Sequence, residues 1–305
     1  MDRLESMSVL VAVVDAGSLS AAARQLGMPL ATVSRKVAEL ETQLKTRLLT
    51  RTTRQLSLTE AGVSYVAACR RILEDVGEAE RAATGEYTTP KGDLTITAPV
   101  VFGRLHVVPV VAAFLALYPE IDVRLVLLDR VVNLLEEHID VAVRIGDLPD
   151  STSVAIGLGA IRRVMCASPG YLAEHGVPQV PRDITGHRCI TVEGLGAARN
   201  WVLRADKAPV QVAVHSRLVV NTVDAAIEAA MLGVGLTRVL SYQIKDALED
   251  GKLDIVLEAF EPLPWPISLV HAGQAPLPLK LRAFLDFATP RLRSRVAQTR
   301  AGGKP

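Results

Sequence analysis

Basic and small polar side chains concentrate in one short stretch of the sequence. From Arg24 to Arg54 there are seven basic and two acidic residues, which leaves 27 of the 34 basic and 31 of the 33 acidic residues for the rest of the chain. Side chains of this kind donate hydrogen bonds to base edges and phosphate oxygens. Because the whole chain has a net charge of only +1, this local positive block predicts a nucleic-acid interface. The alternative is a helix pair whose charges are merely solvated.

Two helices joined by a tight turn are expected to position these side chains. Ser18 can cap the first helix, whose apolar residues recur every three or four positions. Gly27 can end it in the left-handed conformation, and Pro29 suits the first turn of the next helix. That second helix, about residues 29–45, is expected to bury one stripe along its length. The stripe consists of Val33, Val37, Leu40, Leu44 and Leu48.

The second helix turns a small, polar face away from this stripe at its N-terminal end. A recognition helix contacts base edges in the major groove with residues at that end. Residues 49–58 then alternate as in a hairpin strand, and their arginines suit the phosphate backbone or a minor groove. The pattern is a winged helix-turn-helix. The candidate DNA-binding residues are Ala31, Thr32, Ser34, Arg35, Lys36, Arg51 and Arg54.

Composition argues against several other classes of protein. Hydrophobic residues make up 49% and charged residues 22%, which is globular, and 305 residues allow two or three domains. Aromatic residues at 4% argue against a single-strand binder built on stacking. Cys69, Cys166 and Cys189 lie far apart and are expected to be buried thiols. The longest apolar run, 107–118, falls short of a membrane span, so we expect a cytoplasmic protein without a membrane partner.

No arrangement of residues in the sequence suggests catalysis. The six histidines lack the i, i+4 spacing of a zinc helix and are expected to be satisfied structural residues. The sequence has no Gly-x-Ser-x-Gly elbow and no Walker loop. We therefore expect no enzymatic activity, no metal and no cofactor.

The segment from Ser18 to Gly62 resembles the N-terminal domain of the LysR-type transcriptional regulators, and the resemblance continues through the whole chain. Many relatives have Ser-Gln-Pro where this chain has Pro29-Leu30-Ala31, so base readout should depend more on Thr32, Ser34, Arg35 and Lys36. The resemblance implies a winged helix-turn-helix over residues 1–59. The motifs that carry it are Val33-Ser34-Arg35, Leu40-Glu41, Arg51 to Arg54, and Leu58-Thr59-Glu60-Ala61-Gly62.

A long helix without proline is expected over residues 60–88. Its apolar stripe can pack onto its own chain or pair with a second copy as a coiled coil, and the resemblance implies a dimerisation helix. A homodimer, or a homotetramer, would place two recognition helices on successive turns of DNA. The stripe consists of Val66, Cys69, Leu73 and Val76, widened by Tyr65, Ile72 and Ala79.

Strands and helices alternate after Gly92, which predicts parallel sheets with helices on their faces. The resemblance implies a two-lobed α/β effector domain over residues 89–290, similar to periplasmic solute-binding proteins. Lobe I would comprise 89–162 and 266–290, and lobe II 163–265. Strands are expected at 141–145, 163–167 and 210–220, and helices at 102–118 and 131–138. The tail 291–305 has five basic residues and no acid and is expected to be disordered.

Ligands of open α/β sheets bind beyond the carboxyl ends of strands, next to helix N-termini. This rule selects four turns of the C-terminal domain for a small-molecule effector. Arg144 and Arg238 could each pair with an anionic effector or form a surface ion pair. The candidate effector-binding residues are Ala98, Val100, Val101, Phe102, Arg144, Gly146, Thr222, Leu236 and Arg238.

These observations predict a sequence-specific DNA-binding transcriptional regulator that is controlled by an effector bound between the two lobes. Its partners would be double-stranded DNA, further copies of the chain and, for an activator, RNA polymerase. The alternative is a solute-binding protein whose N-terminal helices only oligomerise. The basic wing and the lack of a signal peptide argue against that alternative.

Overall fold

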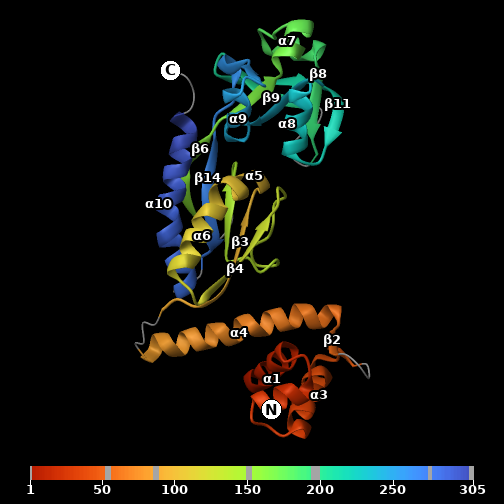
Figure 1. Cartoon of the computed structure of the whole chain (residues 1–305), viewed down its shortest axis with the longest axis vertical. Coiled ribbons are helices and arrows are strands. Elements are labelled where there is room, and N and C mark those ends of the chain that lie inside the picture. The colour runs from red at the N-terminus through yellow and green to blue at the C-terminus, as the bar shows by residue number, and fades with distance from the viewer. Residues whose placement is uncertain are drawn as a thin grey trace. The chain divides into compact units, whose positions relative to one another are not determined.

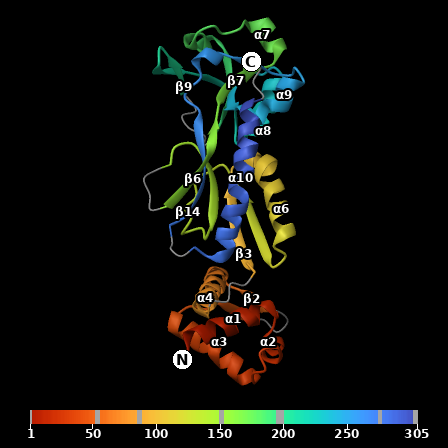
Figure 2. The same ribbon diagram turned by 90° about the vertical axis from the view of Figure 1, so that its left-hand side faces the viewer.

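The computed structural model describes residues 2–51, 56–84, 89–148, 153–193, 200–273 and 277–301. The chain forms two compact units, Met1–Thr89 and Pro90–Pro305 (Figures 1 and 2). The first unit is mainly helical and the second contains two five-stranded sheets. This division agrees with the expected order of a small helical domain followed by an α/β domain.

The N-terminal unit is a three-helix core with a hairpin and one long helix. The Ser18 side chain accepts a hydrogen bond of 3.1 Å from the Ala21 N–H, and Gly27 has φ +63°. The predicted helix cap and helix stop are therefore confirmed. The elements are α1 (Arg3–Asp15), α2 (Leu19–Gln25), α3 (Leu30–Leu44), β1 (Leu49–Arg51), β2 (Leu56–Leu58) and α4 (Glu60–Thr84).

Helix α3 buries the predicted stripe in this core. Val33, Val37 and Leu40 are fully buried. The helix ends at Leu44 because Lys45 has φ +51°, so Leu48 is buried beyond the helix rather than on it. The stripe thus continues from the helix into the segment that leads to the hairpin.

Helix α4 packs against α1 of the same chain over its N-terminal half. Val66 and Cys69 are buried in the core of this unit, and Leu73 is partly buried there. Arg70 also forms an ion pair with Asp15 at the end of α1. The prediction that this stripe mediates a coiled coil is therefore wrong for these residues, because packing onto their own chain already covers them.

The C-terminal unit has two lobes, each built on a mixed sheet. The sheet of lobe I has the order β4-β3-β5-β14-β6, with β14 antiparallel to both neighbours. Its strands are β3 (Gly92–Ala98), β4 (Ile121–Leu127), β5 (Val141–Ile145), β6 (Ser153–Ile161) and β14 (Trp265–Ala272). The antiparallel strands correct the expectation of purely parallel sheets.

The sheet of lobe II has the order β11-β8-β12-β7-β13, and β7 is antiparallel to both of its neighbours. The predicted strand 210–220 is two strands that belong to different sheets. The sheet strands are β7 (Arg163–Ala167), β8 (Arg188–Val192), β11 (His215–Val220), β12 (Leu236–Leu240) and β13 (Asp254–Val256), beside a hairpin of β9 (Asn200–Ala205) and β10 (Ala208–Ala213). The helices of this lobe are α7 (Pro169–His175), η2 (Pro181–Gly186), α8 (Val223–Met231), η3 (Ser241–Ile244), α9 (Lys245–Glu249) and η4 (Glu258–Phe260).

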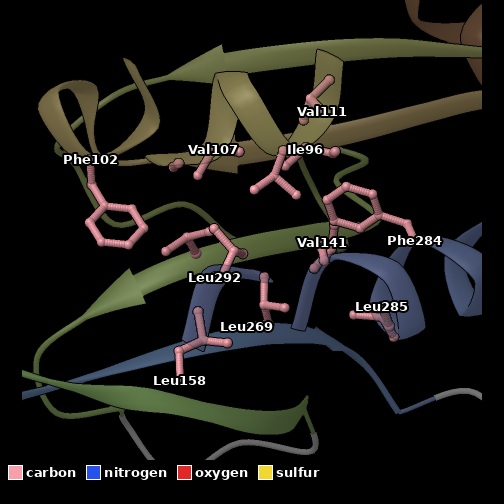
Figure 3. Close-up of a cluster of buried hydrophobic side chains, with 14 of the residues drawn as sticks. Ile96, Phe102, Val107, Val111, Val141, Leu158, Leu269, Phe284, Leu285 and Leu292 are labelled. Atoms are coloured by element: carbon pink, nitrogen blue, oxygen red, sulfur yellow. The ribbon is translucent and has the colours of Figure 1, made fainter. Parts of the chain in front are cut away.

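Helices α6 (Val108–Leu117) and α10 (Leu279–Ala301) lie side by side on one face of the lobe I sheet (Figure 2). Figure 3 shows the core between them and the sheet, where Phe284 and Leu292 meet Ile96 and Val141. Leu292 and Val296 of α10 are fully buried. The predicted disordered tail is therefore wrong from residue 291 to Ala301, because apolar residues between its arginines anchor the helix; residues 302–305 lie outside the described part.

Residues 131–133 have no regular secondary structure and residues 134–138 form turns, so the predicted helix 131–138 is wrong. Val132 and Leu134 pack with Ala142 of β5 and so cover the other face of the sheet. Strand β5 begins with Val141, Ala142 and Val143, which are buried because both faces of the strand are covered in this way.

The predicted helix 102–118 is broken by a π-helical turn. It consists of α5 (Val100–Phe102), the π-helix η1 (Gly103–Val107) and α6. Pro109 lacks the N–H that would bond to the Leu105 carbonyl, and Arg295 of α10 donates to that oxygen instead, at 3.4 Å. Val100–Leu117 is long and apolar enough to span a membrane, but Phe102, Val107 and Phe114 are buried in the lobe I core.

Two chain crossings join the lobes, and one arginine connects them. Arg162 lies between β6 and β7, on the first crossing. Its guanidinium donates to Glu261 at 2.7 and 2.8 Å and also pairs with Glu258, and both carboxylates lie on the returning crossing before β14. The Arg162 carbonyl accepts from the Ser241 N–H at 3.0 Å. The ion pairs of Arg162 with Glu258 and Glu261 therefore connect the first crossing to the second.

Candidate DNA-binding face and ligand cavity

The exposed face of α3 carries four of the predicted DNA-binding residues. Ala31 and Arg35 are exposed, and Thr32 and Ser34 are half-buried. Arg35 lies 3.9 Å from Glu39, with its side chain 69% exposed. Such an exposed pair holds the guanidinium weakly, so Arg35 is free to turn toward a partner.

The structure places Lys36 differently from the prediction. Its ammonium donates to the Glu5 carboxylate of α1 at 2.6 Å, and its side chain is only 14% exposed. Lys36 therefore connects α3 to α1 instead of extending from the outer face. The prediction missed this pairing because the two residues are 31 positions apart in the sequence.

Leu30 was not predicted as a site residue, although it is the first residue of α3 and 50% exposed. An apolar side chain at this end of a recognition helix can contact the methyl group of thymine. In the sequence, the position of Leu30 outside the buried stripe could have indicated that its side chain is exposed.

The Glu41 carboxylate holds the start of the hairpin in place. One of its oxygens accepts hydrogen bonds from the backbone N–H groups of Leu48 and Leu49, at 2.8 and 3.0 Å. The hairpin pairs Leu49 with Leu58 and Arg51 with Leu56. Residues 52–55, which include Arg54, lie outside the described residues, as does the side chain of Arg51.

The exit from the hairpin is equally well defined. The Thr59 hydroxyl donates to the Arg47 carbonyl at 2.7 Å and accepts from the Gly62 N–H at 2.9 Å, which caps α4. Gly62 lies so close to the hairpin that a Cβ there would be 2.0 Å from the Leu48 carbonyl oxygen. The Leu-Thr-x-x-Gly motif therefore fixes α4 against the base of the wing.

A cavity of about 120 Å³ opens between the two lobes of the C-terminal unit. Lobe I contributes Pro99, Asp129 and Ile145, with Trp265 at the start of β14, and lobe II contributes Arg163 and Arg238, among others. Of the predicted effector residues, Arg238 lines this cavity. At three other turns the lining residue is a sequence neighbour of a predicted one: Pro99, Ile145 and Val223.

The other predicted effector residues have structural positions. The Val100 N–H donates to the Asp129 carboxylate at 3.1 Å, and the Thr222 hydroxyl caps α8 by accepting from the Ala225 N–H at 3.3 Å. Gly146 has φ +110°, a conformation that favours glycine. Four side chains point into hydrophobic cores, namely Ala98, Val101, Phe102 and Leu236.

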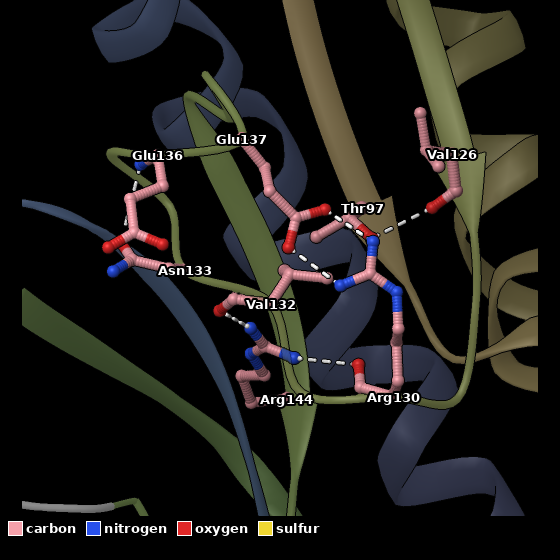
Figure 4. A network of polar contacts seen from close by, with 8 residues as sticks. All are labelled: Thr97, Val126, Arg130, Val132, Asn133, Glu136, Glu137 and Arg144. Carbon is pink, nitrogen blue, oxygen red and sulfur yellow. Dashed lines mark hydrogen bonds and ion pairs between the residues drawn. The ribbon is translucent and has the colours of Figure 1, made fainter.

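Arg144 supports a loop instead of facing the cavity. Its guanidinium donates to the Val132 carbonyl at 2.6 Å and contacts the Arg130 carbonyl at 3.5 Å (Figure 4). Arg130 in turn makes a bidentate pair with Glu137, at 2.5 and 2.7 Å. Neither predicted role, anion binding or a surface ion pair of its own, describes Arg144 in this structure.

Two arginines and one carboxylate give the cavity its charge. The Arg163 guanidinium lies 4.3 Å from the centre of the Trp265 ring, and that of Arg238 lies 5.5 Å from the Trp201 ring. Burial, together with nearby Arg163, lowers the pKa of Arg238 to about 10. Among the described residues no carboxylate pairs with either arginine.

The fold and these two features define a winged helix-turn-helix protein with a two-lobed ligand domain. Residues 4–63 match the bacterial regulatory helix-turn-helix family of LysR type, and residues 88–293 match the LysR substrate binding domain. The chain therefore belongs to the LysR family of transcriptional regulators, which combine a DNA-binding domain with an effector-binding domain.

Individual relatives agree with this assignment along most of the chain. The probable HTH-type transcriptional regulator LtrA of Klebsiella pneumoniae is 32% identical over 94% of this chain and 94% of its own length. The transcriptional activator AaeR of Escherichia coli is 30% identical over 95% and 94%. The solved structure of CrgA, a LysR-type regulator from Neisseria meningitidis, matches with a TM-score of 0.60 and 32% identity over 94% and 98%. These relatives are named as regulators and not as enzymes.

Proposed function

We propose that α3 reads the major groove of double-stranded DNA through its exposed N-terminal face. The observation that carries this proposal is the exposure of Arg35 and Ala31 opposite a fully buried stripe. Thr32 and Ser34 add hydrogen-bonding groups on the same end, and Leu30 adds an apolar contact. Arg51 and Arg54 of the wing would contact phosphates or a minor groove. Lys36 would act indirectly, by holding α3 against α1.

Salt-titrated binding to the DNA upstream of the protein's own start codon tests this function. We expect binding that survives competitor DNA and weakens steeply with salt. Arg35→Ala should cost about 1–3 kcal/mol and relax the sequence preference, whereas Arg54→Ala should weaken binding to all sequences and reduce the salt slope. Equal losses from both variants with an unchanged preference would contradict the assignment of α3 as the reading helix.

We also propose that the chain is a homodimer through the face of α4 that its own core leaves uncovered. Ile72 is 40% exposed, and Ala68 and Val76, one turn away on either side, are half-buried. Ile72 and Val76 are not among the residues packed into the core of this unit, unlike Val66, Cys69 and Leu73. A dimer could associate further into a tetramer.

Ile72→Glu should shift the oligomer toward the monomer, because a charge would have to be buried in the α4 interface. Val63→Glu is the matched control, since Val63 is 57% exposed on the same helix and about two and a half turns away, on the opposite side. Sedimentation velocity would measure both variants. A dimer that survives Ile72→Glu unchanged would exclude this face as the interface.

The cavity between the lobes is the proposed effector site, and Arg238 its predicted residue. The effector would be a small molecule, with no further cofactor. RNA polymerase would be a partner if the protein is an activator, and we expect the protein to act in the cytoplasm, where its DNA lies. The family assignment and the DNA-binding face support these proposals.

A further inference from the structure

The charged groups around the cavity restrict the kind of molecule that can occupy it. Arg163 and Arg238 come from neighbouring antiparallel strands of lobe II. Arg238 pairs with Met165, and Arg163 pairs with Leu240, so the two arginines are diagonal neighbours on one face of the sheet. Diagonal neighbours are roughly 7–8 Å apart, which long side chains bridge easily. Two guanidinium groups can therefore converge on one ligand group.

Neither arginine pairs with a carboxylate within the part of the chain that the structure describes. Among the described residues the buried Nε of Arg163 has no hydrogen-bond partner, and the hydrogen bond from Arg238 to the Val202 carbonyl is long, at 3.5 Å. Each guanidinium lies over the face of a tryptophan ring, Arg163 over Trp265 and Arg238 over Trp201. Such stacking does not use the N–H groups at the edge of the guanidinium, which can donate to a ligand. Two adjacent positive charges without a carboxylate favour an anion, and a carboxylate is the best geometric match for the guanidinium fork.

The opposite side of the cavity carries a negative charge. Asp129 follows β4 in lobe I, and its carboxylate accepts the Val100 N–H at 3.1 Å. This contact occupies the helix N-terminus at which an anion would otherwise bind. The Asp129 side chain is exposed to solvent at the edge of the cavity. A ligand with an ammonium group would pair with this carboxylate.

The remaining lining is uncharged and largely apolar, with polar groups only from Tyr242 and Gln243 besides the tryptophan ring of Trp265, and the space is small. Pro99, Ile145, Val223 and Leu240 offer no charge. A volume of about 120 Å³ accommodates roughly ten non-hydrogen atoms, at about one water-sized sphere for each. The carbon skeleton of the ligand should therefore be short and apolar.

From these contacts we infer that the effector is a small amphoteric molecule, an amino acid with an apolar side chain. Its carboxylate binds Arg163 and Arg238, its ammonium group binds Asp129, and its side chain contacts the apolar lining. This inference rests on the proposed function, in which the cavity is the effector site.

Isothermal titration of the full-length protein with each of the twenty standard L-amino acids tests the inference. For each amino acid that binds, the series includes its analogue without the ammonium group and its analogue without the carboxylate; for leucine these are 4-methylpentanoate and 3-methylbutylamine. We expect at least one apolar amino acid to bind, and each of its two truncated analogues to bind at least tenfold more weakly. Equal binding of the carboxylate analogue, or no binding by any amino acid, would overturn the proposal.

Substitutions at Asp129 and Arg238 test the ammonium-binding and carboxylate-binding sides of the cavity independently. Asp129→Asn keeps an oxygen for the Val100 N–H and should abolish the preference for the amino acid over its carboxylate analogue. Arg238→Gln should weaken both ligands at least tenfold. Arg182→Gln, an exposed arginine of η2 in the same lobe, is the matched control and should change neither affinity. A preference that survives Asp129→Asn would show that Asp129 does not bind the ammonium group.

DNA binding measured in parallel distinguishes the failure of this inference from the failure of the proposed function. A protein that binds its operator but no amino acid would refute only the effector class. A protein that binds amino acids but no DNA would refute the regulator function and leave the cavity assignment intact.

Discussion

A Gly62→Ala variant should lose about 3 kcal/mol of stability in its N-terminal unit, together with most of its affinity for DNA. The new Cβ would lie 2.0 Å from the Leu48 carbonyl oxygen, so either α4 or the base of the hairpin has to move. Neither is a flexible side-chain end, and overpacking against backbone costs about 1–3 kcal/mol or more. The Leu48 carbonyl also accepts from the Thr59 N–H at 3.0 Å, so the displacement would disturb that hydrogen bond at the base of the hairpin as well.

Calorimetry of the full-length protein would measure the effect. The transition of the N-terminal unit should fall by roughly 10 °C or more, given the usual 4–8 °C for each kcal/mol in a domain of this size. Gly170→Ala is the control, because no atom lies within 4 Å of a Cβ at that position. If both variants behave alike, the close approach at Gly62 has no energetic consequence.

The C-terminal unit should lose stability as the pH falls from about 6.5 to about 4, and His106 should account for up to about 3 kcal/mol of that loss. His106 is buried, and neither of its ring nitrogens has a hydrogen-bond partner among the described residues. It packs between Phe102 and Tyr242, with ring centres 4.7 and 5.5 Å away. Burial, and then the charge of Arg295, lower the pKa of His106 from 6.5 to about 4.

The direction of this pH dependence follows from the pKa of His106 in the folded and the unfolded protein. In the unfolded chain His106 takes up a proton near pH 6.5, whereas in the folded protein it stays neutral until about pH 4. Protonation therefore favours the unfolded chain in that window, and above pH 6.5 the group contributes no pH dependence.

Denaturant unfolding across this pH range would compare the wild type with His106→Leu, which should lack this component. Carboxylates also titrate near pH 4, so the difference between the two proteins is the relevant quantity. His215→Leu, at an exposed histidine of β11, is the matched control substitution. A nuclear magnetic resonance titration that placed the pKa of His106 near 6.5 would contradict the prediction.

His106 also corrects the expectation that the histidines are satisfied structural residues. His187 does have a partner, the Tyr171 hydroxyl, at 3.2 Å, and the three cysteines are free and buried as predicted. The sequence could not distinguish His106 from His187, because a hydrogen-bond partner is supplied by residues distant in the chain.

Local signals predicted the first domain well. Ser18 and Gly27 act within a few residues, so the cap and the turn followed from the sequence alone. Strands 141–145 and 163–167 were predicted with the bounds that the structure has, because each is short and mostly apolar, with one arginine. By contrast, the ion pair of Lys36 with Glu5 and the helix through residue 291 depend on tertiary packing.

The sequence predicted only part of the cavity lining, and the reason lies in the topology of the sheets. The rule that ligands bind beyond the carboxyl ends of strands assumes parallel strands. Strands β7 and β14 are antiparallel to their neighbours, so their first residues, Arg163 and Trp265, lie at the cavity. A rule that considers only strand ends cannot select residues at strand beginnings, and both were missed.

The pairing of Arg162 with Glu258 and Glu261 has a consequence for how the lobes can move. Two crossing strands that were independent could twist about each other, and the lobes could then rotate in any direction. A guanidinium on one crossing that binds two carboxylates further along the chain opposes such torsion. We therefore expect the lobes to move mainly as a hinge, which would narrow or widen the mouth of the cavity.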